Sequence, residues 1–210
     1  MSGETAKREY RKKARAEQEQ ATRERITEAA VKLHGSVGPA RTTVSGVAQE
    51  AGVQRATVYR HFPDEASLFA ACSAHYWERH PLPDVESLKG IRDPGERLRR
   101  ALAEFYEFYE ANEAMLEKTG QDAHLVAAME APRAAFLGFL GYASTVIMKG
   151  RPERDAARRR TAAAVGHALH FATWQSLTRT QGLTNAEAVA VATAMVEGAG
   201  SARPRPSRHA

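Results

Sequence analysis

The stretch that decides the fold runs from Thr42 to Phe69 and reads TTVSGVAQEAGVQRATVYRHFPDEASLF. Its first part spaces apolar residues at i, i+3, i+4 and i+7, as on one face of a helix: Val44, Val47, Ala48 and Ala51. Thr42 or Thr43 can cap the start of this helix, and Gly52 suits the left-handed residue that ends one. The pattern predicts a short helix followed by a glycine turn.

A second short helix is predicted to follow the turn. Val58 and Phe62 lie one turn apart on its inward face, and Pro63 cannot continue it. The remaining side chains are cationic, hydroxyl or aromatic: Arg55, Thr57, Tyr59, Arg60 and His61. Two helices joined by a glycine turn, with such side chains on the second, are typical of a protein that reads the DNA major groove.

The chain resembles the TetR family of bacterial transcriptional regulators over about residues 22 to 70. The segment RERITEAAVKLHGSVGPARTTV looks like that family's first helix and link, with Ile26, Ala29, Ala30 and Leu33 facing inward. ATVYRHFPDEASLF matches its recognition helix and the start of its fourth helix. The resemblance implies an all-α fold of about nine helices, in which an N-terminal three-helix helix-turn-helix domain precedes a helical bundle for ligand binding and dimerisation.

The resemblance also implies which residues contact DNA. Positions that reach base edges are occupied by Arg55, Ala56 and Arg60, and an arginine there can pair bidentately with guanine. Positions that hydrogen-bond phosphate are occupied by Thr43, Thr57, Tyr59 and His61.

Four residues depart from the family pattern. Glu65 stands where lysine is common, Gln54 where a small hydroxyl cap is usual, and His34 and Pro39 where aromatic residues are customary. These departures put individual phosphate contacts in doubt, but not the fold. Glu65 and Gln54 also favour an alternative function, a small-molecule-binding or interaction module with a degenerate DNA-binding unit.

Composition favours a soluble cytoplasmic protein. No run of about 18 apolar residues indicates a membrane span, and MSGETAKREYRKKAR lacks the apolar core of a secretory signal. Cys72 is the only cysteine, which excludes an internal disulfide and suits a reducing compartment. We expect this cysteine to pack as a small apolar residue rather than to sense redox state.

Positive charge is concentrated at the two ends of the chain. Residues 1–25 have a net charge of +3, and the last ten residues add three arginines and no acid. Basic arms beside a DNA-reading unit can pair with phosphates, although a solvated, disordered arm is the alternative. We therefore expect a basic N-terminal arm at 1–20, a helix-turn-helix domain at 21–80, a ligand-binding and dimerisation domain at 81–200, and a disordered basic tail at 201–210.

The C-terminal region reads as helical throughout. We expect a helix from Asp93, a helix or turn over 112–120, and a helical stretch over 121–149 with a kink or break at Pro132. One long helix should follow from Asp155 to Gly182. A last helix should bury Ala188, Val191, Ala192, Met195 and Val196. Small residues in the last two helices would allow them to pair with their symmetry mates, giving a homodimer that matches a palindromic operator.

Aromatic, histidine and methionine side chains of this region are the candidate ligand site. In the resembled family such residues often line a pocket for a small, fairly hydrophobic inducer, and pockets are mostly apolar with a few polar groups. Taken singly, each reads more simply as core. The candidates are Phe105, Tyr109, His124, Met129, Phe136, Phe139, Tyr142, His167, His170, Phe171 and Trp174.

No chemistry beyond binding is indicated. His167 and His170 could share a metal, but no further ligand lies near them in the sequence. No catalytic triad, phosphate-binding glycine loop or paired acids stand out, so we expect no enzyme, metal or cofactor. The sequence predicts a homodimeric regulator of double-stranded DNA, a repressor released from its operator by a small hydrophobic ligand.

Overall fold

The computed structural model describes residues 2–201, which form helices joined by short links. The helices are α1 (Ser2–Ser36), η1 (Pro39–Arg41), α2 (Val44–Glu50), α3 (Arg55–His61), α4 (Glu65–Arg79), η2 (Ser87–Gly90), α5 (Pro94–Asp122), η3 (Ala127–Met129), α6 (Glu130–Ile147), α7 (Asp155–Ala168), α8 (Phe171–Gln175), the π-helical turn η4 (Ser176–Thr180) and α9 (Asn185–Ser201). The all-α prediction of about nine helices is confirmed over this range. The predicted tail at 201–210 lies outside the described residues from residue 202 onward.

The chain divides into two compact units. Unit 1 comprises Met1–Pro81 and Ala114–Arg133, and unit 2 comprises Leu82–Glu113 and Ala134–Ala210. The sequence-based boundaries assigned residues 114–133 to the C-terminal domain instead. Within unit 1 this stretch packs against α4 through η3, and its Asp122 accepts a 2.9 Å hydrogen bond from the backbone N–H of Ala40. Gly38, at φ +92°, makes room for the same carboxylate, with which a Cβ would collide.

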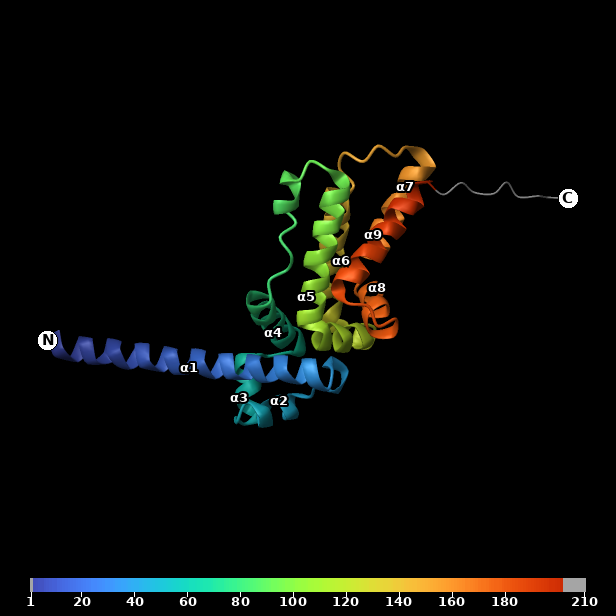
Figure 1. Cartoon of the computed structure of the whole chain (residues 1–210). Coiled ribbons are helices and arrows are strands. Elements are labelled where there is room, and N and C mark those ends of the chain that lie inside the picture. Colours follow the sequence, from blue (N-terminus) through green and yellow to red (C-terminus); the bar gives the residue numbers. More distant parts are fainter. Residues whose placement is uncertain (1, 202–210) are drawn as a thin grey trace. The chain divides into compact units, whose positions relative to one another are not determined.

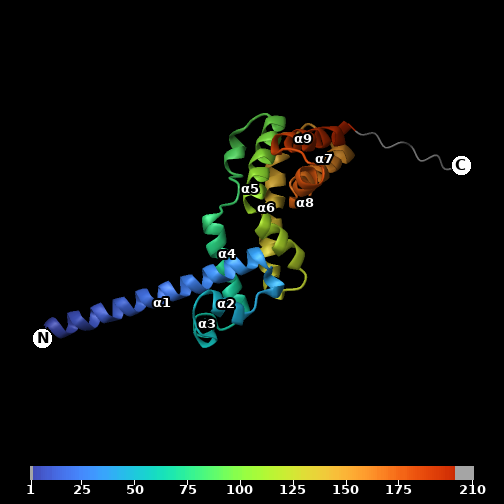
Figure 2. The ribbon, with the colours of Figure 1, turned by 60° about the horizontal axis from the view of Figure 1, so that its bottom comes forward.

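The core of unit 1 lies between α1 and the three helices that follow it. Figures 1 and 2 show α2 and α3 on one side of α1 and α4 on the other. Apolar side chains from all four helices are buried together: Ile26, Ala29, Ala30, Val47, Ala48, Ala51, Val58, Phe62, Leu68 and Cys72. The cluster contains the predicted inward residues of these helices except Leu33 and Val44, which pack against it partly buried, and it leaves the outer face of α3 uncovered.

Local signals fix the short helices of unit 1. The Thr43 hydroxyl accepts a 3.0 Å hydrogen bond from the N–H of Gly46 and caps α2, and Gly52 adopts φ +64° directly after that helix. Asp64 caps α4 in a capping box with Ser67. Gln54 makes no side-chain cap at the start of α3, in keeping with its place among the departures.

Three expectations about later helices were wrong. Helix α5 continues without a break to Asp122, so no separate turn covers 112–120. Pro132 lies in the first turn of α6, where proline is tolerated, rather than at a kink or break inside a longer helix. The predicted long helix from Asp155 ends at Ala168 and resumes as α8.

Two buried tyrosines of α5 donate hydrogen bonds to the backbone carbonyls at the end of α7. The hydroxyl of Tyr106 donates to the carbonyl of Ala168 at 3.0 Å, and that of Tyr109 donates to the carbonyl of Leu169 at 2.5 Å. These carbonyls would accept from N–H groups of the next turn in a continuous helix. The two side-chain bonds satisfy them and allow the chain to change direction before Phe171.

The last helix buries a narrower stripe than predicted. Ala188, Ala192 and Val196 are buried, but Val191 is 39% and Met195 is 48% exposed. Helices α7 and α9 pack side by side in unit 2 (Figures 1 and 2). Because α7 covers only one side of α9, the apolar residues on the outer side stay exposed.

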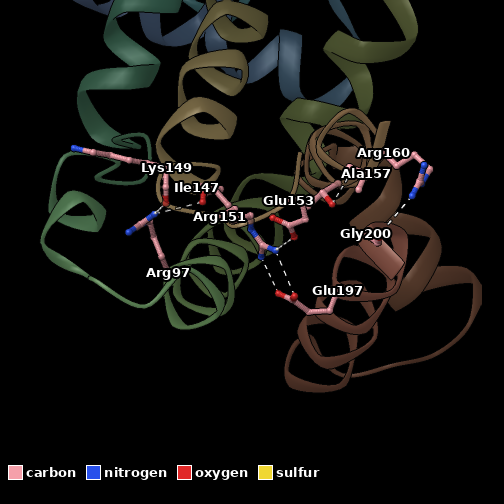
Figure 3. Close-up of polar contacts among 10 residues, drawn as sticks. Arg97, Ile147, Lys149, Arg151, Glu153, Ala157, Arg160, Glu197 and Gly200 are labelled. Atoms are coloured by element: carbon pink, nitrogen blue, oxygen red, sulfur yellow. Dashed lines mark hydrogen bonds and ion pairs between the residues drawn. The ribbon is translucent and has the colours of Figure 1, made fainter. Parts of the chain in front are cut away.

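Buried arginines hold the ends of the unit 2 helices (Figure 3). Arg97 of α5 donates to the carbonyls of Val146 and Lys149 at the end of α6 and to that of Ile91. Arg151, whose side chain is 2% exposed, pairs with Glu197 of α9 at 2.8 Å. The Arg97 contacts supply donors and positive charge to carbonyls at the end of α6, whereas Arg151 forms a side-chain ion pair with α9.

Candidate DNA interface and ligand site

The outer face of α3 presents the three residues predicted to reach bases, Arg55, Ala56 and Arg60, together with Tyr59, which was predicted to bind phosphate. Arg55, Ala56, Tyr59 and Arg60 are all exposed, whereas Val58 between them is 1% exposed. The helical spacing places the four on one face, because residues three and four apart are neighbours. A guanidinium nitrogen of Arg55 lies 3.3 Å from the hydroxyl of Tyr59, and the guanidinium also lies over the Tyr59 ring. This face is polar, cationic and free of covering elements among the described residues.

The residues predicted to bind phosphate surround this face. Thr43 is exposed at the start of α2, and because its oxygen accepts from Gly46, its own O–H remains able to donate. Thr57 and His61 are partly buried on the flank of α3. Burial, then the charges of Arg60 and Arg23, lower the pKa of His61. His61 is therefore a neutral donor near pH 7.

Sequence reasoning missed Arg23 as part of this arrangement. Its guanidinium donates to the carbonyl of His61 at 2.7 Å and lies 4.1 Å from the ring centroid of Phe62. It thereby fixes the end of α3 against α1. The available signal was its position one turn before Ile26, which places a cation beside the apolar face of the first helix.

The other departures from the family pattern have structural roles. Glu65 is exposed in the first turn of α4, where a carboxylate favours the helix dipole. His34 is buried, with its ring 4.9 Å from that of Phe69 and its Nδ1 3.4 Å from the Cys72 sulfur. Burial lowers the pKa of His34 to about 4 and raises that of Cys72 to about 12. Both groups are therefore neutral at pH 7, and Cys72 packs in the core.

Six of the predicted ligand-site residues form one aromatic cluster in unit 2. Phe105, Tyr109 and Trp174 are fully buried. Ring centroids lie 5.7 Å apart for Phe105 and Phe139, 6.1 Å for Phe105 and Tyr109, and 5.5 Å for Tyr109 and Phe171. Phe136 extends the cluster, 6.4 Å from Phe139, and both are only partly buried. The cluster thus runs from a partly exposed end on α6 to a buried end on α8.

The polar groups of this cluster already form hydrogen bonds with other groups of the protein. The hydroxyl of Tyr109 binds the Leu169 carbonyl, and the Trp174 indole N–H donates to Asn185 at 2.8 Å. Burial raises the pKa of Tyr109, so it stays a neutral donor. In this conformation the cluster is packed as core.

The remaining predicted ligand residues lie elsewhere. His167 and His170 are exposed on unit 2, and Tyr142 is 42% exposed and donates to Glu86. His124 and Met129 belong to unit 1, the first exposed and the second buried. Within unit 2, the structure therefore leaves His167, His170 and Tyr142 outside the aromatic cluster.

A small hollow of about 40 Å³ lies in unit 1 beside the α2 start. It is lined in part by His34, Thr43, Leu68 and Phe69. A pocket for a drug-sized ligand measures about 300–1,000 Å³, so this hollow has room only for water. Among the described residues no group of three or more His, Cys, Asp or Glu could hold a metal, and no helix could cross a membrane.

Residues 26–72 match the family described as bacterial regulatory proteins, tetR family. This match covers α2, α3 and the core that holds them. Over this segment the chain is similar to the TetR family of regulators. No curated protein sequence matches it.

Solved structures of TetR-type regulators share the fold over most of the chain. A TetR-like transcriptional regulator from Rhodococcus sp. RHA1 is 19% identical with a TM-score of 0.62, covering 87% of this chain and 97% of its own. FadR from Bacillus subtilis in complex with stearoyl-CoA is 20% identical with a TM-score of 0.53, covering 84% and 97%. A protein from Saccharomonospora viridis in complex with choline is 18% identical with a TM-score of 0.54, covering 85% and 96%. At these identities the likeness establishes the fold.

Proposed function

We propose that this chain is a TetR-family regulator, a cytoplasmic repressor that binds a palindromic operator as a homodimer and is released by a small hydrophobic ligand. One observation supports DNA reading above all others. Arg55, Tyr59 and Arg60 share an exposed face of α3 while Val58 and Phe62 hold that helix in the core. An exposed recognition helix with arginines at base-reading positions fits the major groove.

Substituting the arginines of α3 tests this function. Arg55→Ala or Arg60→Ala should each weaken binding to the operator by about 1–3 kcal/mol, because each removes a base-edge donor. Arg79→Ala, which removes an exposed arginine of α4, is the matched control and should change affinity little. The probe is a duplex selected by the full chain from a random-sequence pool, and fluorescence anisotropy gives the affinities.

The alternative function has its own signature. If no duplex is selected, or if the α3 variants bind as the parent does, the chain is a ligand-binding or interaction module with a degenerate DNA-binding unit. Gln54, which does not cap α3, and Glu65, which cannot pair with phosphate, are the features that favour this alternative.

The homodimer is proposed to form through α7 and α9. The exposed side of α9 is apolar or small over three turns: Ala190, Val191, Ala194, Met195 and Gly198. Helix α7 likewise exposes Ala163 and Gly166. Small residues allow close helix approach, and a two-fold pairing would present two recognition helices to a palindromic site.

The ligand site is proposed at the aromatic cluster of unit 2. Phe136 and Phe139 at its partly exposed end offer an entry for an apolar group. The bacterial relatives solved with stearoyl-CoA and with choline bind small molecules, which supports a ligand-responsive regulator here. Release requires that the ligand bind better to the conformation that does not fit the operator. A thermal-shift screen of acyl thioesters, hydrophobic acids and quaternary amines tests this part of the proposal.

A further inference from the structure

The N-terminal half of α1 carries a one-sided basic stripe. We use this name for Lys7, Arg8, Arg11, Lys12 and Arg15, all of which are exposed. A residue advances about 100° around an α-helix, so residues 18 apart point the same way after about five turns. For four stripe residues, the residue 18 positions later lies in the unit 1 core or packs against it. The pairs are Arg8 with Ile26, Arg11 with Ala29, Lys12 with Ala30, and Arg15 with Leu33.

The stripe therefore faces the side of α1 on which α2 and α3 pack. That side is marked by Lys32, which pairs with Glu50 of α2 at 2.6 Å, and by Arg23, which binds the carbonyl of His61. Both figures of the whole chain show α2 and α3 together on this side and α4 on the other (Figures 1 and 2). The stripe and the proposed DNA interface therefore lie on the same side of α1.

One basic residue of this segment points elsewhere. By the same spacing Lys13 lies in the direction of Val31, between His34 and Glu28. His34 contacts Cys72, and Glu28 contacts Arg79, both on α4. Lys13 therefore faces the α4 side, and it provides an exposed cation outside the stripe.

The stripe opposes helix stability. Lys7 and Arg11, Arg8 and Lys12, and Arg11 and Arg15 are like charges at i and i+4, and each such pair costs a helix about 0.2–0.5 kcal/mol. A favourable partner at this spacing is Glu19, 3.3 Å from Arg15. A helix selected only for stability would alternate its charges. A polyanion against the stripe would remove the repulsion.

We propose that the basic stripe binds the phosphate backbone of operator DNA outside the groove segment read by α3. Its centre lies about 27 Å along α1 from the core residues that hold α3, given a rise of 1.5 Å per residue. A helix with polar residues all round does not fit a membrane surface, which requires an apolar face. The phosphates of a DNA duplex match both the positive charge of the stripe and its position beside the proposed DNA interface. The inference rests on the proposed DNA-binding function and extends the surface that it uses.

A pair of single substitutions tests the stripe. Arg11→Gln and Lys13→Gln remove the same charge from opposite sides of α1 and keep a good helix former. The full chain is measured on its selected duplex, extended by flanking sequence at both ends. Arg11→Gln should lower the slope of log affinity on log salt by about 0.9 for each phosphate that is no longer neutralised, and should weaken binding on the order of tenfold near physiological salt. Lys13→Gln should retain the parental slope.

The outcomes separate this inference from the function on which it rests. If the parent selects no duplex, the DNA-binding function itself fails. If the parent binds but Arg11→Gln and Lys13→Gln behave alike, whether both are neutral or both are weakened, the stripe does not bind phosphate. Loss of binding to phosphatidylserine vesicles by Arg11→Gln, with duplex binding retained, would likewise overturn the proposal. Circular dichroism confirms that both variants keep the parental helix content.

Discussion

At the level of single residues, His34 links the fold of unit 1 to pH. Its imidazole is 7% exposed and contacts Phe69 and Cys72, so burial lowers its pKa to about 4 from 6.5. Below pH 6.5 the unfolded chain binds a proton that the folded chain does not. This group therefore makes the folded state less stable as pH falls from about 6.5 toward 4.

Because of His34, we expect the free energy of unfolding to fall by about 2 kcal/mol when the pH is lowered from 7 to 5. His34→Phe should remove this contribution, because phenylalanine keeps the ring beside Phe69 and cannot be protonated. Urea unfolding of both proteins at the two pH values measures it. His170→Phe, at an exposed position, is the control and should keep the parental pH dependence. An unchanged pH dependence in His34→Phe would contradict the assignment.

At the scale of elements, the arginine that joins α5 to the end of α6 should dominate the stability of unit 2. Arg97 is 4% exposed, and its guanidinium serves carbonyls of Ile91, Val146 and Lys149. Arg97→Met fills similar space but removes the side-chain donor of the Ile91 and Lys149 carbonyls, whereas Val146 keeps the backbone N–H of Lys149; this loss should cost about 3 kcal/mol. The matched change Arg100→Met removes an exposed ion pair with Glu104 and should cost less than about 1 kcal/mol. Equal urea midpoints for the two variants would disprove the role of Arg97.

The elements also show what sequence can and cannot predict. The short helices of unit 1 were predictable because their ends depend on adjacent residues, such as Thr43, Gly52 and Asp64. The end of α7 was not predictable, because Tyr106 and Tyr109 reach it from a helix about 60 positions earlier. Within the candidate sites, the exposed face of α3 followed from helical spacing. The exposure of His167 and His170 followed from a break in the helix that no local residue signals.

At the scale of the whole molecule, the proposed dimer predicts that charge on the outer side of α9 separates the protomers. Val191→Glu and Met195→Glu place carboxylates on the exposed apolar surface, where pairing would bury them without a partner. Sedimentation velocity should show a dimer for the parent and a monomer for each variant. Affinity for the operator should fall in parallel, since each complex would then hold a single recognition helix.

The control for this prediction lies on another helix of unit 2. Ala135 is exposed on α6, which takes no part in the proposed interface. Ala135→Glu should remain dimeric. A monomeric parent, or glutamate variants that stay dimeric, would place the interface elsewhere.

The composition of unit 1 also bears on how the protein is made. Asp122, which accepts from the Ala40 backbone, belongs to a segment that completes unit 1 only after Leu82–Glu113 of unit 2 has been translated. The ribosome therefore releases α2, α3 and α4 well before it synthesises the carboxylate that secures the link at Gly38. A gene truncated after the codon for Pro81 would encode the DNA-reading helices without that anchor, and nascent chains pass through the same incomplete state each time the message is read.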